Sequence, residues 1–267
     1  MIDYRYVIVG GGVAAGHAAR AFVEAGLEKG ELAIVSSESV APYDRPPLSK
    51  SYLLGKKTEN DIVINTPSFY DDHHICLHLK ARVVDIDTDA SVIELDSGEM
   101  IHYEKMLAAT GSSVRKFPRQ ITNGGQIHYL RYLPDSIAIR EAAVWAQSPL
   151  IIGGGYIGLE VAAGLCQLGC DARLIYEGNQ ILPRLFTDKM HHFFARYYEE
   201  QGVRLIGECN VVRFSREGAL TRVHLDSGGS FISDFVVAGI GVAPALELFE
   251  ATEVEVDKGI VVNEYLQ

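Results

Sequence analysis

Residues 4–16 read YRYVIVGGGVAAG, and residues 150–158 read LIIGGGYIG. In each stretch a short apolar run of the kind found in strands ends directly at three glycines, and a helix-forming stretch follows. The sequence therefore predicts the same unit twice, a strand, a tight turn and a helix, with the two copies about 140 residues apart. The helices are expected at 17–25 and 159–168, and the next strands at 32–35 and 172–176.

The spacing of the glycines indicates what the two loops bind. In GxGxxG-type loops the first Gly permits the turn, the second lets a pyrophosphate approach the backbone, and the third lets helix and strand pack closely. These positions are Gly10, Gly12 and Ala15 in the first copy, with Val13 and Ala14 between them, and Gly153, Gly155 and Gly158 in the second. A single copy could equally be a packing turn, but two copies favour two dinucleotide-binding domains.

Alternating apolar and polar residues follow each unit and predict a small antiparallel meander. In the first half these segments are 81–86 and 91–95, and 106–109 is expected to return as a buried strand; in the second half they are 211–214 and 219–225, and 234–239 returns. The predicted fold class is therefore α/β, with two Rossmann-like three-layer domains, each carrying a small antiparallel β-meander.

An acidic residue after the second strand of such a unit selects the nucleotide, because a carboxylate accepts a hydrogen bond from the ribose 2′-hydroxyl and repels a 2′-phosphate. Glu38 is this residue in the first copy and Glu177 in the second. Glu177 follows Gly155 at about the expected distance of 20 residues, which predicts NADH in preference to NADPH. An exposed loop carboxylate is the alternative for each Glu.

The composition of the chain excludes several classes of function. The 267 residues are 48% hydrophobic and 22% charged, which is typical of globular proteins. Because 24 Lys and Arg face 35 Asp and Glu, the net charge of −11 argues against a nucleic acid partner. No apolar run approaches the roughly 20 residues of a membrane span, and no signal peptide is recognisable, so a cytoplasmic location is predicted.

The cysteine and histidine patterns predict neither a disulfide nor a metal site. The cysteines, which form no CxxC pair, are Cys76, Cys166, Cys170 and Cys209. Cys166 and Cys170 share one helix face, where core packing is favoured over a functional thiol pair. The neighbouring histidines, which lack an HExxH order and are interpreted as solvated, are His73, His74, His78, His191 and His192.

The stretch 41–50, APYDRPPLSK, resembles the signature of FAD-dependent, NAD(P)H-linked reductases of the ferredoxin-reductase type, which are flavoproteins with two dinucleotide-binding domains. Within that group, residues 30–36, residues 183–187 and the pair Tyr197–Tyr198 are most similar to monodehydroascorbate reductases. Disulfide reductases of this fold carry a CxxxxC pair after the first glycine loop. Since no Cys occurs before Cys76, a thiol relay is excluded.

The resemblance implies roles for individual residues. Gly12–Ala15 would hold the FAD pyrophosphate, Glu38 its adenosine ribose, and Arg45 its phosphates or ribose. Lys50 would lie beside the isoalloxazine, stabilise the negative charge of reduced flavin, and pair with Glu160 away from water. Further FAD contacts are implied for Val83, Thr110, Gly111 and Arg131, and nicotinamide contacts for Tyr156, Ile157 and Gly241; Arg184 is a further cofactor-binding candidate.

Simpler explanations remain open for three of these residues. Lys50 could be a surface lysine that covers apolar surface with its stem, and Arg45 could form a loop ion pair with Asp44 or Glu38. Glu160 could be an exposed carboxylate in the first turn of a helix, where the helix dipole favours it. The motif that surrounds Lys50 and Arg45 favours the cofactor roles.

The predicted domains are an FAD-binding domain, 1–113 plus 242–267, and an NAD-binding domain, 114–241. Members of the family continue beyond the counterpart of Gln267 with a strand, a Gly-Asp motif that holds the flavin ribityl chain, and a third domain. The FAD-binding domain is therefore expected to be incomplete and the chain to be truncated, with a naturally short paralogue as the alternative.

The resemblance implies an NADH-dependent flavoprotein reductase, which transfers a hydride from NADH to N5 of FAD and releases single electrons to an acceptor. The expected acceptor is the monodehydroascorbate radical. One alternative is a reductase of ferredoxin or rubredoxin, so the partner is expected to be a small molecule or a small redox protein. A non-catalytic NADH-responsive binding module is the other alternative.

Overall fold

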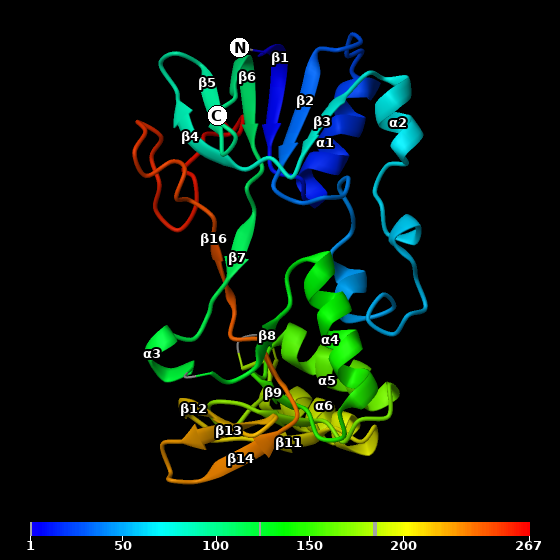
Figure 1. Cartoon of the computed structure of the whole chain (residues 1–267), viewed down its shortest axis with the longest axis vertical. Helices are drawn as coiled ribbons and strands as arrows, with labels where there is room; N and C mark the ends of the chain where they lie inside the picture. Colours follow the sequence, from blue (N-terminus) through cyan, green and yellow to red (C-terminus); the bar gives the residue numbers. More distant parts are fainter. Residues whose placement is uncertain (1, 123, 184–185) are drawn as a thin grey trace. The chain divides into compact units, whose positions relative to one another are not determined.

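The computed structural model describes residues 2–122, 124–183 and 186–267. Its contacts divide the chain into two compact α/β units (Figure 1). Unit 1 consists of Met1–Asp44, Glu59–Ser113 and Ala243–Gln267, and unit 2 of Arg45–Thr58 and Val114–Val242. The segment Arg45–Thr58 thus groups with unit 2, whereas the sequence analysis assigned it to the first domain.

Unit 1 is built on one six-stranded sheet with the strand order β3-β2-β1-β6-β5-β4. The strands are β1 (Ile2–Val9), β2 (Leu32–Ser36), β3 (Cys76–Leu79), β4 (Val83–Asp87), β5 (Val92–Leu95) and β6 (Met100–Ala108). Strand β3 pairs in parallel with β2, β2 with β1, and β1 with β6. Strand β5 pairs antiparallel with both β6 and β4. The strand order therefore reverses between β1 and β6, the place where doubly wound sheets bind their ligands.

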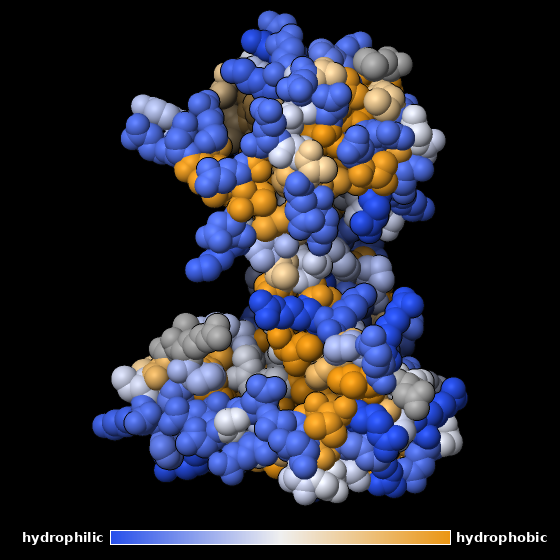
Figure 2. Space-filling model, turned by 90° about the vertical axis from the view of Figure 1, so that its left-hand side faces the viewer, coloured by the Kyte–Doolittle hydropathy of each residue, from blue (hydrophilic) through white to orange (hydrophobic). Residues whose placement is uncertain are grey.

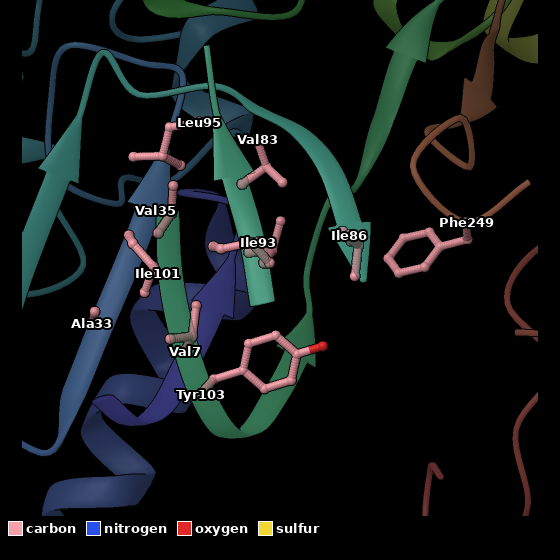
Figure 3. Close-up of a cluster of buried hydrophobic side chains, with 11 residues drawn as sticks. Val7, Ala33, Val35, Val83, Ile86, Ile93, Leu95, Ile101, Tyr103 and Phe249 are labelled. Atoms are coloured by element: carbon pink, nitrogen blue, oxygen red, sulfur yellow. The ribbon is translucent and has the colours of Figure 1, made fainter. Parts of the chain in front are cut away.

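Alternating side chains of this sheet fill two separate cores, because successive residues of a strand face opposite sides. Val7 and Val35 join the cluster in Figure 3, in which Phe249, from the C-terminal segment, packs with Ile86 of β4. On the other face Ile8 packs with buried residues of helix α1 (Val13–Glu24). The remaining helical segments of the unit are α2 (Pro67–Asp72) and the short η2 (Glu59–Asp61).

Unit 2 contains a five-stranded parallel sheet with the order β11-β10-β9-β15-β8. Its strands are β8 (Ile127–Tyr129), β9 (Leu150–Ile152), β10 (Arg173–Ile175), β11 (Arg204–Ile206) and β15 (Val236–Ala238). Its helical segments are η1 (Pro46–Ser49), α3 (Arg119–Thr122), α4 (Leu133–Trp145), α5 (Tyr156–Gln167) and α6 (Asp188–Glu200). Here too the strand order reverses beside the strand that precedes the glycine loop, between β9 and β15.

The two meanders are joined to their units in different ways. In unit 1 β6 runs without a break from the meander into the parallel sheet, and residues 106–108 are part of this strand, as predicted. Leu107 is 38% exposed, so the prediction that this strand is buried was wrong. In unit 2 the meander is a sheet of its own, formed by β12 (Val211–Glu217), β13 (Leu220–Leu225) and β14 (Ser230–Ser233). Asp234 and Phe235 separate β14 from β15, and Asp234 Oδ2 accepts hydrogen bonds from the amides of Gln147 and Ser148.

Two strands, β7 (Ser112–Val114) and β16 (Val242–Pro244), lie where the chain passes from one unit to the other, and they pair with each other. The surface drawn in Figure 2 is largely hydrophilic, with apolar residues between the polar ones. Among the described residues, no helix is both long enough and apolar enough to cross a membrane. The α/β class with two nucleotide-binding-type units, predicted from the sequence, is confirmed.

Candidate functional site

The first glycine loop connects β1 to α1 at the point where the strand order reverses. Gly10 has a φ of 122°, and a Cβ at this position would overlap the carbonyl of Ala109, which follows β6. Only glycine fits this combination of backbone conformation and close approach. Gly12 is the N-cap of α1 and offers no side chain to the amides of the first turn. These amides are therefore suited to an anionic group such as a pyrophosphate.

Glu38 lies just after β2, on the segment that leaves the sheet beside this loop. The hydroxyl of Tyr43 donates a hydrogen bond of 2.6 Å to Glu38 Oε2, and the amide of Glu38 donates to Ser36 Oγ. Tyr43 is 1% exposed and is a residue whose part in the site the sequence analysis missed. The available signal was its position in the stretch 41–50, a few residues after Glu38.

The second glycine loop, between β9 and α5, repeats this geometry in unit 2. Gly153 has a φ of 116°, and a Cβ there would lie only 2.3 Å from the carbonyl oxygen of Gly239, too close for any side chain. A Cβ at Gly158 would overlap the carbonyl of Gly153, which explains the close packing of helix on loop. Gly155, by contrast, has nothing within 4 Å of its Cβ position, so its backbone is open to a ligand.

Glu177 is exposed two residues beyond the end of β10. The glycine loop lies against the start of this segment, because a Cβ at Gly154 would touch the Tyr176 ring at 3.1 Å. The amide of Glu208 donates to the carbonyl of Gly178 at 2.7 Å and so fixes the turn after Glu177. The structure thus places the segment that carries the predicted ribose-binding carboxylate against the predicted pyrophosphate loop of unit 2.

The segment 45–58 is anchored on two helices of unit 2. Ser136 of α4 is fully buried and donates to the carbonyl of Leu48 at 2.7 Å, and Arg140 of the same helix donates to the carbonyl of Tyr52. A Cβ at Gly164 of α5 would touch the Leu53 side chain at 3.0 Å. The fold of unit 2 therefore sets the position of the 3-10 turn η1 and of Lys50 directly after it.

Lys50 and Glu160 form the ion pair that the resemblance implies. Lys50 Nζ donates to Glu160 Oε1 at 2.6 Å, and the buried Ser49 donates to Glu160 Oε2 at 2.5 Å. The Lys50 side chain is 52% exposed and that of Glu160 23%, so the expectation of a pair away from water was wrong. Ser49 is a second residue that the sequence analysis missed, although the motif contains it.

Arg45 and Arg131 come together at the start of α4. Arg45 Nη1 donates to the carbonyl of Arg131 at 3.0 Å, and its guanidinium lies over the Tyr132 ring. Arg131 Nε is buried and has no hydrogen-bond partner among the described residues. A buried charged donor of this kind requires an acceptor, so Arg131 Nε fits an anionic group such as a phosphate.

The other predicted contacts are distributed over both units. Thr110 donates from Oγ1 to the carbonyl of Ala245, and Val83 is 7% exposed at the start of β4. Tyr156 and Ile157 are 55% and 39% exposed at the start of α5. The two glycines among these candidates, Gly111 and Gly241, have positive φ values of 71° and 99°. Arg184 lies outside the described residues.

Two interpretations of the cysteines and histidines were wrong. Cys170 lies beyond the end of α5 and does not share a helix face with Cys166. His191 is 3% exposed and is not solvated. All four cysteines are free, and burial raises the pKa of the Cys170 thiol. Among residues 2–122, 124–183 and 186–267, no three His, Cys, Asp or Glu side chains form a group that could hold a metal ion.

Residues 4–267 match the family described as "Pyridine nucleotide-disulphide oxidoreductase". The chain belongs to this family. Within it, the chain is 36% identical over 281 residues to "Monodehydroascorbate reductase, seedling isozyme" of Cucumis sativus and 34% identical over 282 residues to the monodehydroascorbate reductase of Pisum sativum. Both alignments cover 99% of this chain and 65% of the relative.

Two solved structures of reductases are similar to this chain over nearly its whole length. A putidaredoxin reductase in covalent complex with putidaredoxin superposes with a TM-score of 0.91, at 31% identity, over 100% of this chain and 65% of that one. The ferredoxin reductase for the CYP199A2 system of Rhodopseudomonas palustris superposes with a TM-score of 0.89, at 29% identity, over 97% of this chain and 64% of that one.

The chain thus spans about two thirds of the length of the relatives that it matches. FAD and NAD(H) are the cofactors of the family, and they are the two that the sequence predicts. The relatives include cytosolic, peroxisomal and chloroplastic or mitochondrial forms, so the cytoplasmic location stays a prediction.

Proposed function

We propose that this chain carries the nucleotide sites of an NADH-dependent flavoprotein reductase. The observation that carries the proposal is the repeated geometry of the two glycine loops, each at the reversal of strand order in its own sheet. The ion pair of Lys50 and Glu160 adds a charged group of the kind that redox chemistry on a flavin uses. A packing role alone would not require the open face at Gly155.

We assign FAD to the first loop and NADH to the second. The amides at the start of α1, beginning after Gly12, would hold the FAD pyrophosphate, and Glu38, held by Tyr43, would accept from its ribose. In unit 2 the amides after Gly155 and the carboxylate of Glu177 would take the corresponding parts of NADH.

The two cofactors, when bound, supply the redox chemistry, in which a hydride passes from NADH to FAD and single electrons pass on to an acceptor. Lys50 supplies a positive charge that would stabilise the negative charge developing during this reaction. Glu160 holds the Lys50 ammonium by the bond of 2.6 Å and keeps it from turning freely into solvent. Arg131 supplies an unused buried donor for an anionic group.

The acceptor that we propose is the monodehydroascorbate radical, which the relatives of 34% to 36% identity are named for. A small redox protein is the second candidate, because the similar solved structures include a putidaredoxin reductase bound to putidaredoxin. A non-catalytic module that binds NADH is the third candidate, and it differs from both enzymes in lacking a reducible flavin.

Spectroscopy of the purified chain with added FAD tests the proposal. We expect flavin absorption bands to co-purify or to appear on reconstitution, and NADH to bleach them in a stopped-flow experiment. Ascorbate formation from the monodehydroascorbate radical would then support the first acceptor, and reduction of a ferredoxin or rubredoxin the second. A chain that binds no FAD after reconstitution would contradict the enzyme assignment.

A further inference from the structure

The two carboxylate oxygens of Glu160 accept hydrogen bonds from two different kinds of donor. Oε1 accepts from the Lys50 ammonium at 2.6 Å, and Oε2 accepts from the Ser49 hydroxyl at 2.5 Å. Ser49 Oγ also lies 3.3 Å from the carbonyl of Pro46. A hydroxyl carries one proton, and the shorter contact to a charged acceptor is the stronger bond, so the proton of Ser49 belongs to Glu160.

The two partners also differ in how firmly they are held. The Lys50 side chain is long and half exposed, and an exposed Lys–Glu pair by itself rarely fixes a geometry. Ser49 has one rotatable side-chain bond and is 2% exposed. A short buried donor therefore restrains the carboxylate more strongly than the lysine does.

Ser49 itself is placed by the fold and not by Glu160. It ends η1, whose Leu48 carbonyl is held by the buried Ser136 of α4. A Cβ at Gly164 of α5 would come to 3.9 Å from the Ser49 carbonyl, which leaves the turn in contact with the same helix that carries Glu160. The hydroxyl thus starts from a fixed point on one side of the carboxylate.

We infer that Ser49 is a positioning residue, which orients the Glu160 carboxylate so that Oε1 is presented to Lys50. This inference rests on the proposed function for its consequence, since it is through Lys50 that Ser49 would affect flavin reduction. The orientation itself is a property of the chain alone and can be measured whether or not the chain binds FAD.

Carbon-13 NMR of the side-chain carboxylates follows the surroundings of the Glu160 carboxylate. It uses FAD-free protein labelled at glutamate, with the Glu160 signal assigned through Glu160→Gln. In Ser49→Ala we expect the Glu160 signal to shift, because Oε2 loses its donor and the carboxylate then samples several rotamers. Ser49→Cys keeps the size of the side chain and weakens the donor, and its signal should lie between those of Ser49→Ala and the unchanged chain.

Ser233→Ala is the matched control, because Ser233 is also buried in unit 2 and donates to a main-chain carbonyl, that of Phe235, at 2.6 Å. It should leave the Glu160 signal unchanged. In FAD-loaded protein, Ser49→Ala should slow flavin reduction by NADH about tenfold, the effect of losing one hydrogen bond to a charged group, and Ser233→Ala should not slow it.

The outcomes separate the two proposals. A Glu160 signal that stays unchanged in Ser49→Ala overturns the positioning role, whatever the flavin result. A signal that shifts while the rate of flavin reduction stays unchanged overturns the effect of Ser49 on flavin reduction. Absence of flavin reduction in the unchanged chain overturns the proposed function, and a shifted signal would then retain Ser49 only as the residue that orients Glu160.

Discussion

Lys50 Nζ and Glu160 Oε1 lie 2.6 Å apart, although 110 residues separate them in the sequence. Lys50 follows the 3-10 turn η1, and Glu160 lies in the first turns of α5, directly after the second glycine loop. The pair therefore joins the stretch 41–50 to the loop that we assign to NADH, through residues of one compact unit.

Replacement of Lys50 tests the role of this charge. Lys50→Met keeps the length of the side chain and removes the ammonium, so flavin reduction by NADH should slow by about tenfold to a hundredfold. Stopped-flow absorbance at the flavin bands measures the rate. Lys56→Met, which removes an exposed lysine of the same segment, is the control and should leave the rate unchanged. Equal rates in both variants would contradict the role of Lys50.

The choice between NADH and NADPH should depend on Glu177. Glu177→Arg removes the acceptor for the 2′-hydroxyl and adds a donor for a 2′-phosphate, so the preference for NADH should fall about a hundredfold. The ratio of the two dissociation constants, from titrations with each nucleotide, measures it. Glu141→Arg changes the net charge equally at an exposed position of α4 and should keep the ratio. An unchanged ratio of the two dissociation constants in Glu177→Arg would show that Glu177 does not bind the ribose.

Two glycines of one loop should respond to alanine in opposite ways. Gly153→Ala forces a φ of 116° on a residue with a Cβ and overlaps the Gly239 backbone, which should cost about 2 kcal/mol of unfolding free energy or more. Gly155→Ala meets nothing in the chain and should leave stability unchanged, but should weaken NADH binding about tenfold, since the methyl group occupies the place of the pyrophosphate. Urea unfolding and nucleotide titration measure the two effects, and unaltered NADH affinity in Gly155→Ala would argue against the loop assignment.

Asn65 should be a major determinant of the stability of unit 1. It is 4% exposed, its Nδ2 donates to the carbonyl of Gly16 in α1, and its Oδ1 accepts from Arg20. Asn65→Ala removes these bonds from a buried site and should lower the free energy of unfolding by about 2 kcal/mol. Arg5→Ala breaks the exposed pair with Glu31 and is the control, with little expected change in the urea midpoint. Equal midpoints in the two variants would show that the buried network contributes nothing.

The stability of the chain should fall at low pH partly because of His128. Burial in unit 2 lowers the pKa of His128 below its ordinary value of 6.5, so the unfolded chain binds a proton more readily than the folded one. Above pH 6.5 His128 is neutral in both states and does not lower the free energy of unfolding. As the pH falls below 6.5, the unfolded chain takes up the proton first, and the free energy of unfolding decreases. His128→Gln should therefore lose less stability than the unchanged chain between pH 7.5 and pH 5, as measured by urea midpoints. His17→Gln, at an exposed position of α1, should behave as the unchanged chain does.

The sequence predicted the parts of the fold that depend on local pattern. The strands before Gly10 and Gly153 and the helices after them are where apolar runs and glycine spacing placed them, but both helices begin earlier than expected, at Val13 and Tyr156. The reason is that Gly12 and Gly155 act as N-caps, so the residues directly after them already belong to the helix. Glycine-rich spacing gives no local sign of this boundary.

Contacts between distant segments could not be predicted in the same way. The hydrogen bonds of Tyr43 to Glu38 and of Ser49 to Glu160 depend on how the stretch 41–50 packs. Tyrosine and serine are uncharged, so the sequence alone did not suggest that Tyr43 and Ser49 have a role. The partial exposure of Lys50 was missed because a motif identifies residues and not the solvent around them. The meander of unit 2 is a separate sheet because the chain breaks at Asp234 and Phe235, between β14 and β15, and the alternation of polar residues does not show this break.

The fit of Gly10 against the carbonyl of Ala109 joins the first nucleotide loop to the end of β6, a strand nearly a hundred positions later in the chain. In a chimaera assembled from two homologous parents, the segments 1–36 and 100–110 must therefore be inherited together. An exchange that separates them would set one parent's turn against the other parent's backbone, and recombination breakpoints should be chosen outside this pair of segments.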